Sequence, residues 1–140
     1  MTMKNKRIIY KKSPMNYVGN KYKLLNQLYQ YFPTTINNFI DLFCGGLDVS
    51  INTIANNKYA NDINENIIGI YKSFQNHSIE DIFAFIETRI KEFKLTRFNI
   101  EGYLQYRELY NININYHTPL DLFTLSRFSF NNKISFNTNH

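Results

Sequence analysis

A run of apolar residues that ends in adjacent glycines constrains the fold more than any other feature of this chain. Phe39-Ile-Asp-Leu-Phe-Cys-Gly-Gly46 is typical of a buried β-strand that enters a tight turn. A second acid, Asp62, follows Asp41 by about 20 residues, at the tip of the next expected strand. Glycines let a nucleoside cofactor approach the backbone, and an acid at that spacing can bind its ribose hydroxyls. The pattern therefore predicts a nucleoside site at one edge of a parallel sheet.

Each part of this pattern also has a simpler interpretation. The glycines could form an ordinary strand–turn–helix junction, and Asp62 could cap the helix that begins near Glu65. The turn is not a P-loop, because no Gly-Lys-Ser/Thr follows it, and Leu47 stands where the dinucleotide fingerprint could have a third glycine. The lone Cys44 is interpreted as structural, since no histidine stands in a sequence pattern with it that would indicate nucleophilic catalysis.

Strand and helix signals alternate in the first half of the chain, which predicts a parallel α/β fold. An apolar face on the first helix (Leu24, Leu25, Leu28 and Tyr31) and a stripe on the fourth (Ile79, Ile82, Phe83, Ile86, Ile90 and Phe93) are expected to be buried. Ser78 is expected to cap the fourth helix. The expected strands cover residues 38–43 and 58–61, and the expected helices cover residues 21–32, 50–57, 65–74, 79–93, 101–110 and 120–130.

The net charge of +5 is unevenly distributed. A block of cations precedes the first acid, Asp41, and is either a binding segment for a polyanion or a solvated tail. The block consists of Lys4, Lys6, Arg7, Lys11, Lys12, Lys21 and Lys23.

The length of 140 residues favours a single domain. No apolar run approaches the length that spans a membrane, so no membrane partner is expected. A single cysteine fits a reducing cytoplasm, and one cysteine with three scattered histidines makes zinc an unlikely ligand.

A third segment, Pro14-Met-Asn-Tyr-Val-Gly-Asn-Lys21, precedes the glycine turn. Together with Asp41-Leu-Phe-Cys-Gly-Gly46 and Asn61-Asp-Ile-Asn64, it resembles the ordered cofactor motifs of the Dam-like DNA adenine methyltransferases. The resemblance implies an incomplete Rossmann-like methyltransferase fold, in which residues 1–76 bind S-adenosylmethionine and residues 77–140 form a helical region that leads into the target-recognition region.

The resemblance also implies a role for each cofactor-site residue. Tyr17 would pack on S-adenosylmethionine, Lys21 would lie near its carboxylate end, Asp41 would face its methionine moiety and Asp62 would hold its ribose. The complete expected set is Tyr17, Lys21, Asp41, Phe43, Gly45, Gly46, Asp62 and Ile63.

The expected substrate is duplex DNA in a restriction–modification setting, and the methyl acceptor is the amino group of adenine. The segment 120–137 resembles the entry to the recognition region, but Ser135 replaces an arginine that usually precedes Phe-Asn there. The residues expected to contact DNA are Lys11, Lys12, Asn131, Asn132 and Lys133.

The family's acceptor motif, Asp-Pro-Pro-Tyr, is missing, because Pro14, Pro33 and Pro119 are the only prolines and none are adjacent. We therefore expect no catalytic residue in this chain and no activity from it alone. It is interpreted as the N-terminal portion of a longer enzyme, completed by a downstream segment or by a second polypeptide that carries the motif. A non-catalytic remnant that binds S-adenosylmethionine or DNA, half of a split methyltransferase, and an unrelated nucleotide-binding α/β module remain alternatives.

Overall fold

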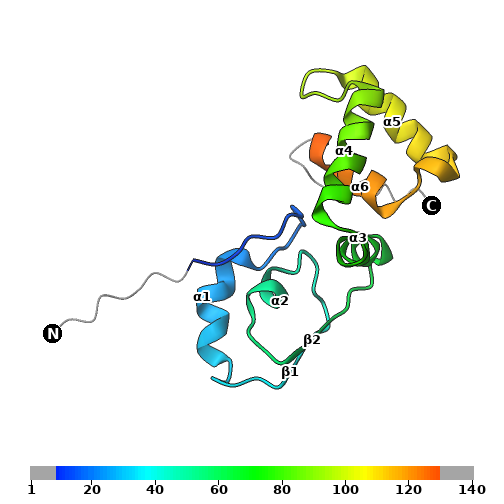
Figure 1. The fold of residues 1–140 in the computed structure, drawn as a ribbon. Helices are drawn as coiled ribbons and strands as arrows, with labels where there is room; N and C mark the ends of the chain where they lie inside the picture. The colour runs from blue at the N-terminus through cyan, green and yellow to red at the C-terminus, as the bar shows by residue number, and fades with distance from the viewer. Residues whose placement is uncertain (1–8, 130–140) are drawn as a thin grey trace. The chain divides into compact units, whose positions relative to one another are not determined.

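The computed structural model describes residues 9–129, and the chain divides into two compact units, Met1–Asn61 and Asp62–His140 (Figure 1). The first unit holds a small parallel sheet with short helices, and the second is helical. No helix within residues 9–129 is long and apolar enough to cross a membrane.

The sheet of the first unit pairs β1 (Asn38–Asp41) with β2 (Asn57–Ala60) in parallel, with Asp41 opposite Ala60. This confirms the prediction of adjacent parallel strands, although β1 is two residues shorter than the expected 38–43 and β2 begins and ends one residue before the expected 58–61. Beyond the strands, the Asn61 amide donates to the Asp41 carbonyl at 2.8 Å and the Cys44 amide donates to the Asn61 carbonyl at 2.9 Å. The pairing therefore continues into the glycine turn.

The predicted helix over residues 21–32 is wrong as a continuous element. The chain instead forms a 3-10 turn η1 (Tyr22–Leu24), a short helix α1 (Leu25–Leu28) and a second 3-10 turn η2 (Tyr29–Tyr31). A 3-10 helix has three residues per turn, whereas an α-helix has 3.6. Side chains spaced for one face of an α-helix therefore point in different directions in this segment. Leu25 is fully buried as expected, but Leu24 and Tyr31 are 46% and 86% exposed.

The helix after the glycine turn, α2, covers Asp48–Asn52 and not the predicted residues 50–57. It ends where Thr53 becomes extended, and the Thr53 hydroxyl donates back to the Val49 carbonyl at 2.8 Å. Residue 57 already belongs to β2, because the crossover between the strands is short.

The N-terminal segment lies along α2 and is held there by side chains of that helix. The Lys11 amide donates to Asn52 Oδ1 at 2.7 Å, and Asn52 Nδ2 donates to the Lys11 carbonyl at 2.7 Å. The Ser13 amide donates to Asp48 Oδ1 at 3.1 Å. Asp48 is only 3% exposed, and this burial raises the pKa of its carboxyl, while the Ser13 amide and the charge of Lys12 offset the effect in part.

The second unit packs helices around α6. In chain order these are α3 (Glu65–Asn76), α4 (Ile79–Phe93), α5 (Ile100–Ile112), the 3-10 turn η3 (Ile114–Tyr116) and α6 (Pro119–Phe128). Every residue from Leu120 to Ser126 is buried, because α6 contacts α3, α4 and α5. Figure 1 shows α6 in orange beside α4 and α5.

The predicted burial of the α4 stripe is confirmed at its C-terminal end and wrong at its start. Phe93 is buried and stacks on Tyr106 of α5 with ring centroids 4.5 Å apart. Ile79 and Phe83 are 62% and 58% exposed, whereas the contacts of α4 with Tyr106 of α5 and Asp121 of α6 come from Phe93 and Arg89 near its C-terminal end. Ser78 caps the helix as predicted, since its Oγ accepts from the Asp81 amide at 3.1 Å.

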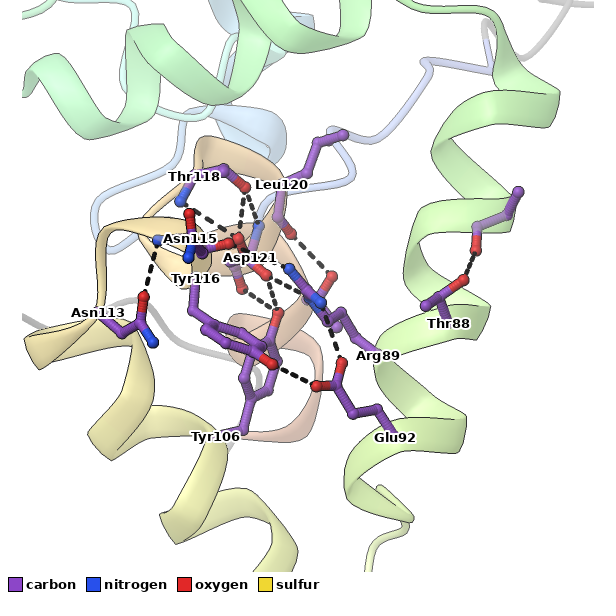
Figure 2. A network of polar contacts seen from close by, with 12 residues as sticks. Thr88, Arg89, Glu92, Tyr106, Asn113, Asn115, Tyr116, Thr118, Leu120 and Asp121 are labelled. Carbon is purple, nitrogen blue, oxygen red and sulfur yellow. Dashed lines mark hydrogen bonds and ion pairs between the residues drawn. The ribbon is translucent and has the colours of Figure 1, made fainter.

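A buried carboxylate, that of Asp121, links α4, α5 and α6 (Figure 2). Its Oδ1 accepts from Arg89 Nε at 2.7 Å and from the Tyr106 hydroxyl at 2.6 Å. Its Oδ2 accepts from the Thr118 amide at 3.2 Å and from the Thr118 hydroxyl at 2.6 Å, which completes a capping box at the start of α6. Each oxygen thus accepts two hydrogen bonds, and this offsets the cost of burying the charge.

We expect Asp121→Ala to lower the free energy of unfolding by about 3–5 kcal/mol, because it leaves the Arg89 charge without its buried partner. Asp81→Ala is the matched control, since Asp81 occupies the same position in the cap of α4 but is exposed. Urea denaturation followed by circular dichroism measures both. Equal losses in the two variants would contradict the central role of Asp121.

Substitutions of Asp48 test how the N-terminal segment is attached. Asp48→Ala deprives the Ser13 amide, in a buried residue, of its acceptor, and we expect a loss of about 1–3 kcal/mol. Asp48→Asn keeps an acceptor oxygen and removes the buried charge, so at neutral pH it should be at least as stable as the parent.

The difference in stability between the parent and Asp48→Asn should also depend on pH. A carboxyl whose pKa is raised by folding binds its proton more tightly in the folded state, so the parent gains stability relative to Asp48→Asn as the pH falls towards the ordinary aspartate range. Thermal melts across that pH range measure the difference. An advantage of Asp48→Asn that grows as the pH falls would contradict this prediction.

Candidate cofactor site

The first unit brings the glycine turn into contact with Tyr17, which lies far away in the sequence. Gly45 has a left-handed backbone with φ +45°, and a Cβ placed on it would lie 3.1 Å from Cδ1 of the Tyr17 ring. A Cβ on Gly46 would lie 3.3 Å from Asp48 Oδ2 and 3.4 Å from Tyr17 Cβ. The glycines are therefore needed for the packing of Tyr17 and α2 against the turn.

The residue after the glycines continues this turn in a strained conformation. Leu47 has φ 63° and ψ 9°, in the left-handed region that glycine adopts without cost. This is the position where the sequence lacks a third glycine. Such outliers concentrate at functional sites, where the surrounding structure holds them in place.

A lysine and an exposed aromatic residue flank the same turn. Lys21 Nζ donates to the Phe43 carbonyl at 3.4 Å, so its ammonium group lies beside the end of the strand segment. The Phe43 side chain itself is 75% exposed. The turn thus presents a cation, an aromatic ring and close-packed backbone from separate motifs.

Asp41 ends β1, and its carboxylate is anchored by the helix that follows the turn. Its Oδ2 accepts from the Ser50 hydroxyl at 2.7 Å, and Ser50 is 5% exposed. This bond uses one carboxylate oxygen and leaves Oδ1 as an acceptor. Sequence reasoning did not identify Ser50, although an acid at the end of an apolar strand already called for a polar partner.

Asp62 and Ile63 begin the second unit. Asp62 Oδ1 accepts from the Asn64 amide at 3.0 Å, whereas Asn64 itself caps α3 by accepting from the amides of Asn66 and Ile67 at 3.2 and 3.4 Å. Asp62 is therefore not the capping residue of α3. Ile63 is 95% exposed.

The structure thus brings together Tyr17, Lys21, Phe43, Gly45 and Gly46 in the first unit. Asp41 lies at the end of the strand that leads into their turn. Asp48 of α2 and Ser13 of the N-terminal segment, whose amide donates to Asp48, carried no recognisable signal in the sequence.

The other expected positions fall in different environments. Lys11 and Lys12 are exposed on the segment along α2, and Cys44 is buried. Asn131, Asn132 and Lys133 lie outside the described residues. Within residues 9–129, no cluster of histidine, cysteine and acidic side chains could hold a metal ion.

Comparison with known proteins identifies relatives that match most of the chain. It is 45% identical over 136 residues to the type II methyltransferase M.FokI of Planomicrobium okeanokoites, and this match covers 97% of the chain and 21% of that relative. It is 44% identical over 128 residues to the modification methylase StsI of Streptococcus sanguinis, covering 91% of the chain and 19% of the relative. The modification methylase LlaI of Lactococcus lactis subsp. lactis is 27% identical over 127 residues, or 90% of the chain and 20% of the relative.

The chain therefore spans about a fifth of the length of these curated relatives. The sequence model of the D12 class N6 adenine-specific DNA methyltransferases matches residues 17–140, which include Tyr17, Lys21, the glycine turn and Asp62. This match covers most of the chain, and the chain belongs to the D12 class N6 adenine-specific DNA methyltransferase family.

Proposed function

We propose that this chain supplies the S-adenosylmethionine-binding part of an enzyme that methylates the exocyclic amino group of adenine in duplex DNA. The observation that carries the proposal is the packing of Tyr17 against Gly45 at the end of β1, which joins two of the expected cofactor motifs. The parallel pairing of β1 with β2 supports a Rossmann-like sheet as the underlying fold.

The described contacts suit each expected role. The Lys21 ammonium beside the turn suits a cofactor carboxylate, and Asp41, fixed through one oxygen by Ser50, suits the methionine amine through the other. Asp62 follows β2 by two positions and suits the ribose hydroxyls. Phe43 in the first unit and Ile63 in the second each expose an apolar side chain, and a side chain of this kind suits contact with the adenine ring. When bound, S-adenosylmethionine supplies the methyl group.

The sheet also supports a role for additional polypeptide. Ile40 and Tyr59 are opposite each other in the β1–β2 register and are 62% and 59% exposed. Parallel sheets are normally covered on both faces, and two strands alone are marginally stable. Further strands would extend the sheet at its edge, and the helices that connect them would cover this face. The same additional polypeptide would carry the Asp-Pro-Pro-Tyr motif that this sequence lacks and complete the acceptor site. The division into residues 1–76 for the cofactor and 77–140 for the approach to DNA is part of this proposal.

A non-catalytic remnant that binds S-adenosylmethionine or DNA is the main alternative. It would bind the cofactor through the same residues, because the contacts among them in the first unit do not require an acceptor motif. The two functions differ in what happens when the missing motif is added, since only an enzyme part then gains methyl transfer.

Cofactor binding tests the assignment of Asp62. We expect weak binding of S-adenosylmethionine by the chain, and Asp62→Ala should remove most of it, because a hydrogen bond from ribose to a carboxylate contributes roughly 1.5–3 kcal/mol. Asn64→Ala is the matched control: it removes the cap of α3 but keeps the carboxylate. Calorimetry that finds equal affinities for the parent and Asp62→Ala would refute this assignment.

Methyl transfer tests the enzyme itself. The purified chain should not methylate adenine in duplex DNA, because its sequence lacks the Asp-Pro-Pro-Tyr motif that would hold the acceptor amino group in reactive geometry. Addition of a polypeptide that carries the family's Asp-Pro-Pro-Tyr motif should restore incorporation of labelled methyl groups, and Asp62→Ala should reduce it. Robust turnover by the chain alone would contradict the proposal, and no turnover with the added part would favour the non-catalytic alternative.

A further inference from the structure

The connection between α4 and α5, residues 94–99, is an ordered loop at the end of the helical unit (Figure 1). Asn99 Nδ2 donates to the Lys94 carbonyl at 2.8 Å, and Thr96 Oγ1 accepts from the amides of Phe98 and Asn99 at 3.2 and 3.0 Å. Leu95 is buried at 4% exposure and anchors the loop to the unit. The backbone of the loop is therefore held in one conformation by its own side chains.

This ordered loop exposes cations and an aromatic ring. Lys91, Lys94 and Arg97 are exposed, and within residues 9–129 none of their side chains makes a hydrogen bond or ion pair. Arg89, two residues before Lys91, differs because it is paired with Asp121 and Glu92. Phe98, beside Arg97, is 93% exposed. We call Lys91, Lys94, Arg97 and Phe98 the α4–α5 corner.

The backbone at Lys94 gives independent evidence of a constraint. The Leu95 amide donates to the Ile90 carbonyl and the Lys94 amide donates to the Lys91 carbonyl, which is the Schellman arrangement at a helix end. Lys94 takes its left-handed position with φ 50° and ψ 43°, where glycine is the usual residue because it has no Cβ. A lysine there keeps a cation on the loop at a cost in stability, and such outliers point to function.

The chemistry of the corner fits duplex DNA. Lysine and arginine side chains contact phosphate oxygens, and an exposed apolar ring packs on sugars or against base steps in the minor groove. We propose that the α4–α5 corner is a DNA-contact surface of this protein, with Lys91, Lys94 and Arg97 on the phosphate backbone and Phe98 against the sugar–base edge. The proposal rests on the proposed function to the extent that duplex DNA is the substrate.

The simplest alternative is a solvated loop. Lys91 lies in the last turn of α4, where a cation stabilises a helix end without any partner. That explanation does not apply to the exposed phenylalanine, and it predicts no effect of the corner on DNA binding.

The cations are tested by the salt dependence of binding. Fluorescence anisotropy with the full chain and a short labelled mixed-sequence duplex, across a series of KCl concentrations, gives the slope of log K against log salt. Lys94→Gln with Arg97→Gln should lower the affinity and flatten the slope by about 0.9 for each phosphate that the variant no longer neutralises. Lys72→Gln is the matched control, because Lys72 is an exposed lysine of α3 in the same unit.

The aromatic ring is tested by a different readout. Phe98→Ala should lower the affinity several-fold while leaving the slope unchanged, because an apolar contact releases no counterions. Phe83→Ala, at a phenylalanine that is 58% exposed near the start of α4, should change neither quantity.

Lys94→Gly separates binding from stability. Glycine relieves the left-handed strain, so the midpoint of thermal unfolding should rise, whereas DNA affinity should fall because a cation has been removed. A purely structural residue would not move the two quantities in opposite directions.

The results also distinguish this inference from the proposed function. Corner variants that bind duplex with the parent's affinity and slope, or a parent chain that shows no duplex binding, would overturn the inference. Neither result changes the calorimetric test of Asp62 with S-adenosylmethionine. If only Lys11→Gln with Lys12→Gln flattened the slope, DNA contact would belong to the N-terminal segment and the corner would be a solvated loop.

Discussion

The parallel hydrogen bonding between β1 and β2 is the constraint on which the candidate cofactor site depends. It places the ends of both strands at one edge, where the Asn61 amide binds the Asp41 carbonyl and the Asn61 carbonyl accepts from Cys44. The glycine turn can then close tightly enough for Tyr17 to pack on Gly45 and for Lys21 to reach the Phe43 carbonyl. Without this pairing, the motifs would be separate segments of sequence.

In the second unit, the buried carboxylate of Asp121 has the corresponding role. It accepts hydrogen bonds from Thr118 at the cap of α6, from the Arg89 guanidinium of α4 and from the Tyr106 hydroxyl of α5, so one charge fixes the mutual orientation of the helices (Figure 2). Its burial is costly unless every oxygen is bonded, and this makes the arrangement specific as well as stable. The same packing fixes the end of α4 from which the α4–α5 corner projects.

Left-handed residues other than glycine occur at both candidate binding regions. Leu47 follows the glycine turn, and Lys94 ends α4. The left-handed conformation costs an ordinary residue about 1–2 kcal/mol. That cost is tolerated where the neighbouring contacts over-determine the backbone, as the hydrogen bonds of Asn99 and Thr96 do around Lys94.

Features that depend on neighbouring residues were predictable from the sequence. The apolar run with its glycines predicted the parallel strand pair, and the capping residue Ser78 predicted where α4 begins. Both signals involve only residues that are close together in the sequence. The cofactor motifs likewise identified the family that the comparison confirmed.

Only the tertiary structure decided the partners of Asp41, Asp48 and Asp121. These partners are Ser50, Ser13 and the Arg89–Tyr106 pair, and they are joined by folding rather than by any local pattern. The exposure of Phe83 and the break in the first helix were decided in the same way. An apolar period states which side chains share a face, but whether another element covers that face depends on contacts between distant parts of the chain.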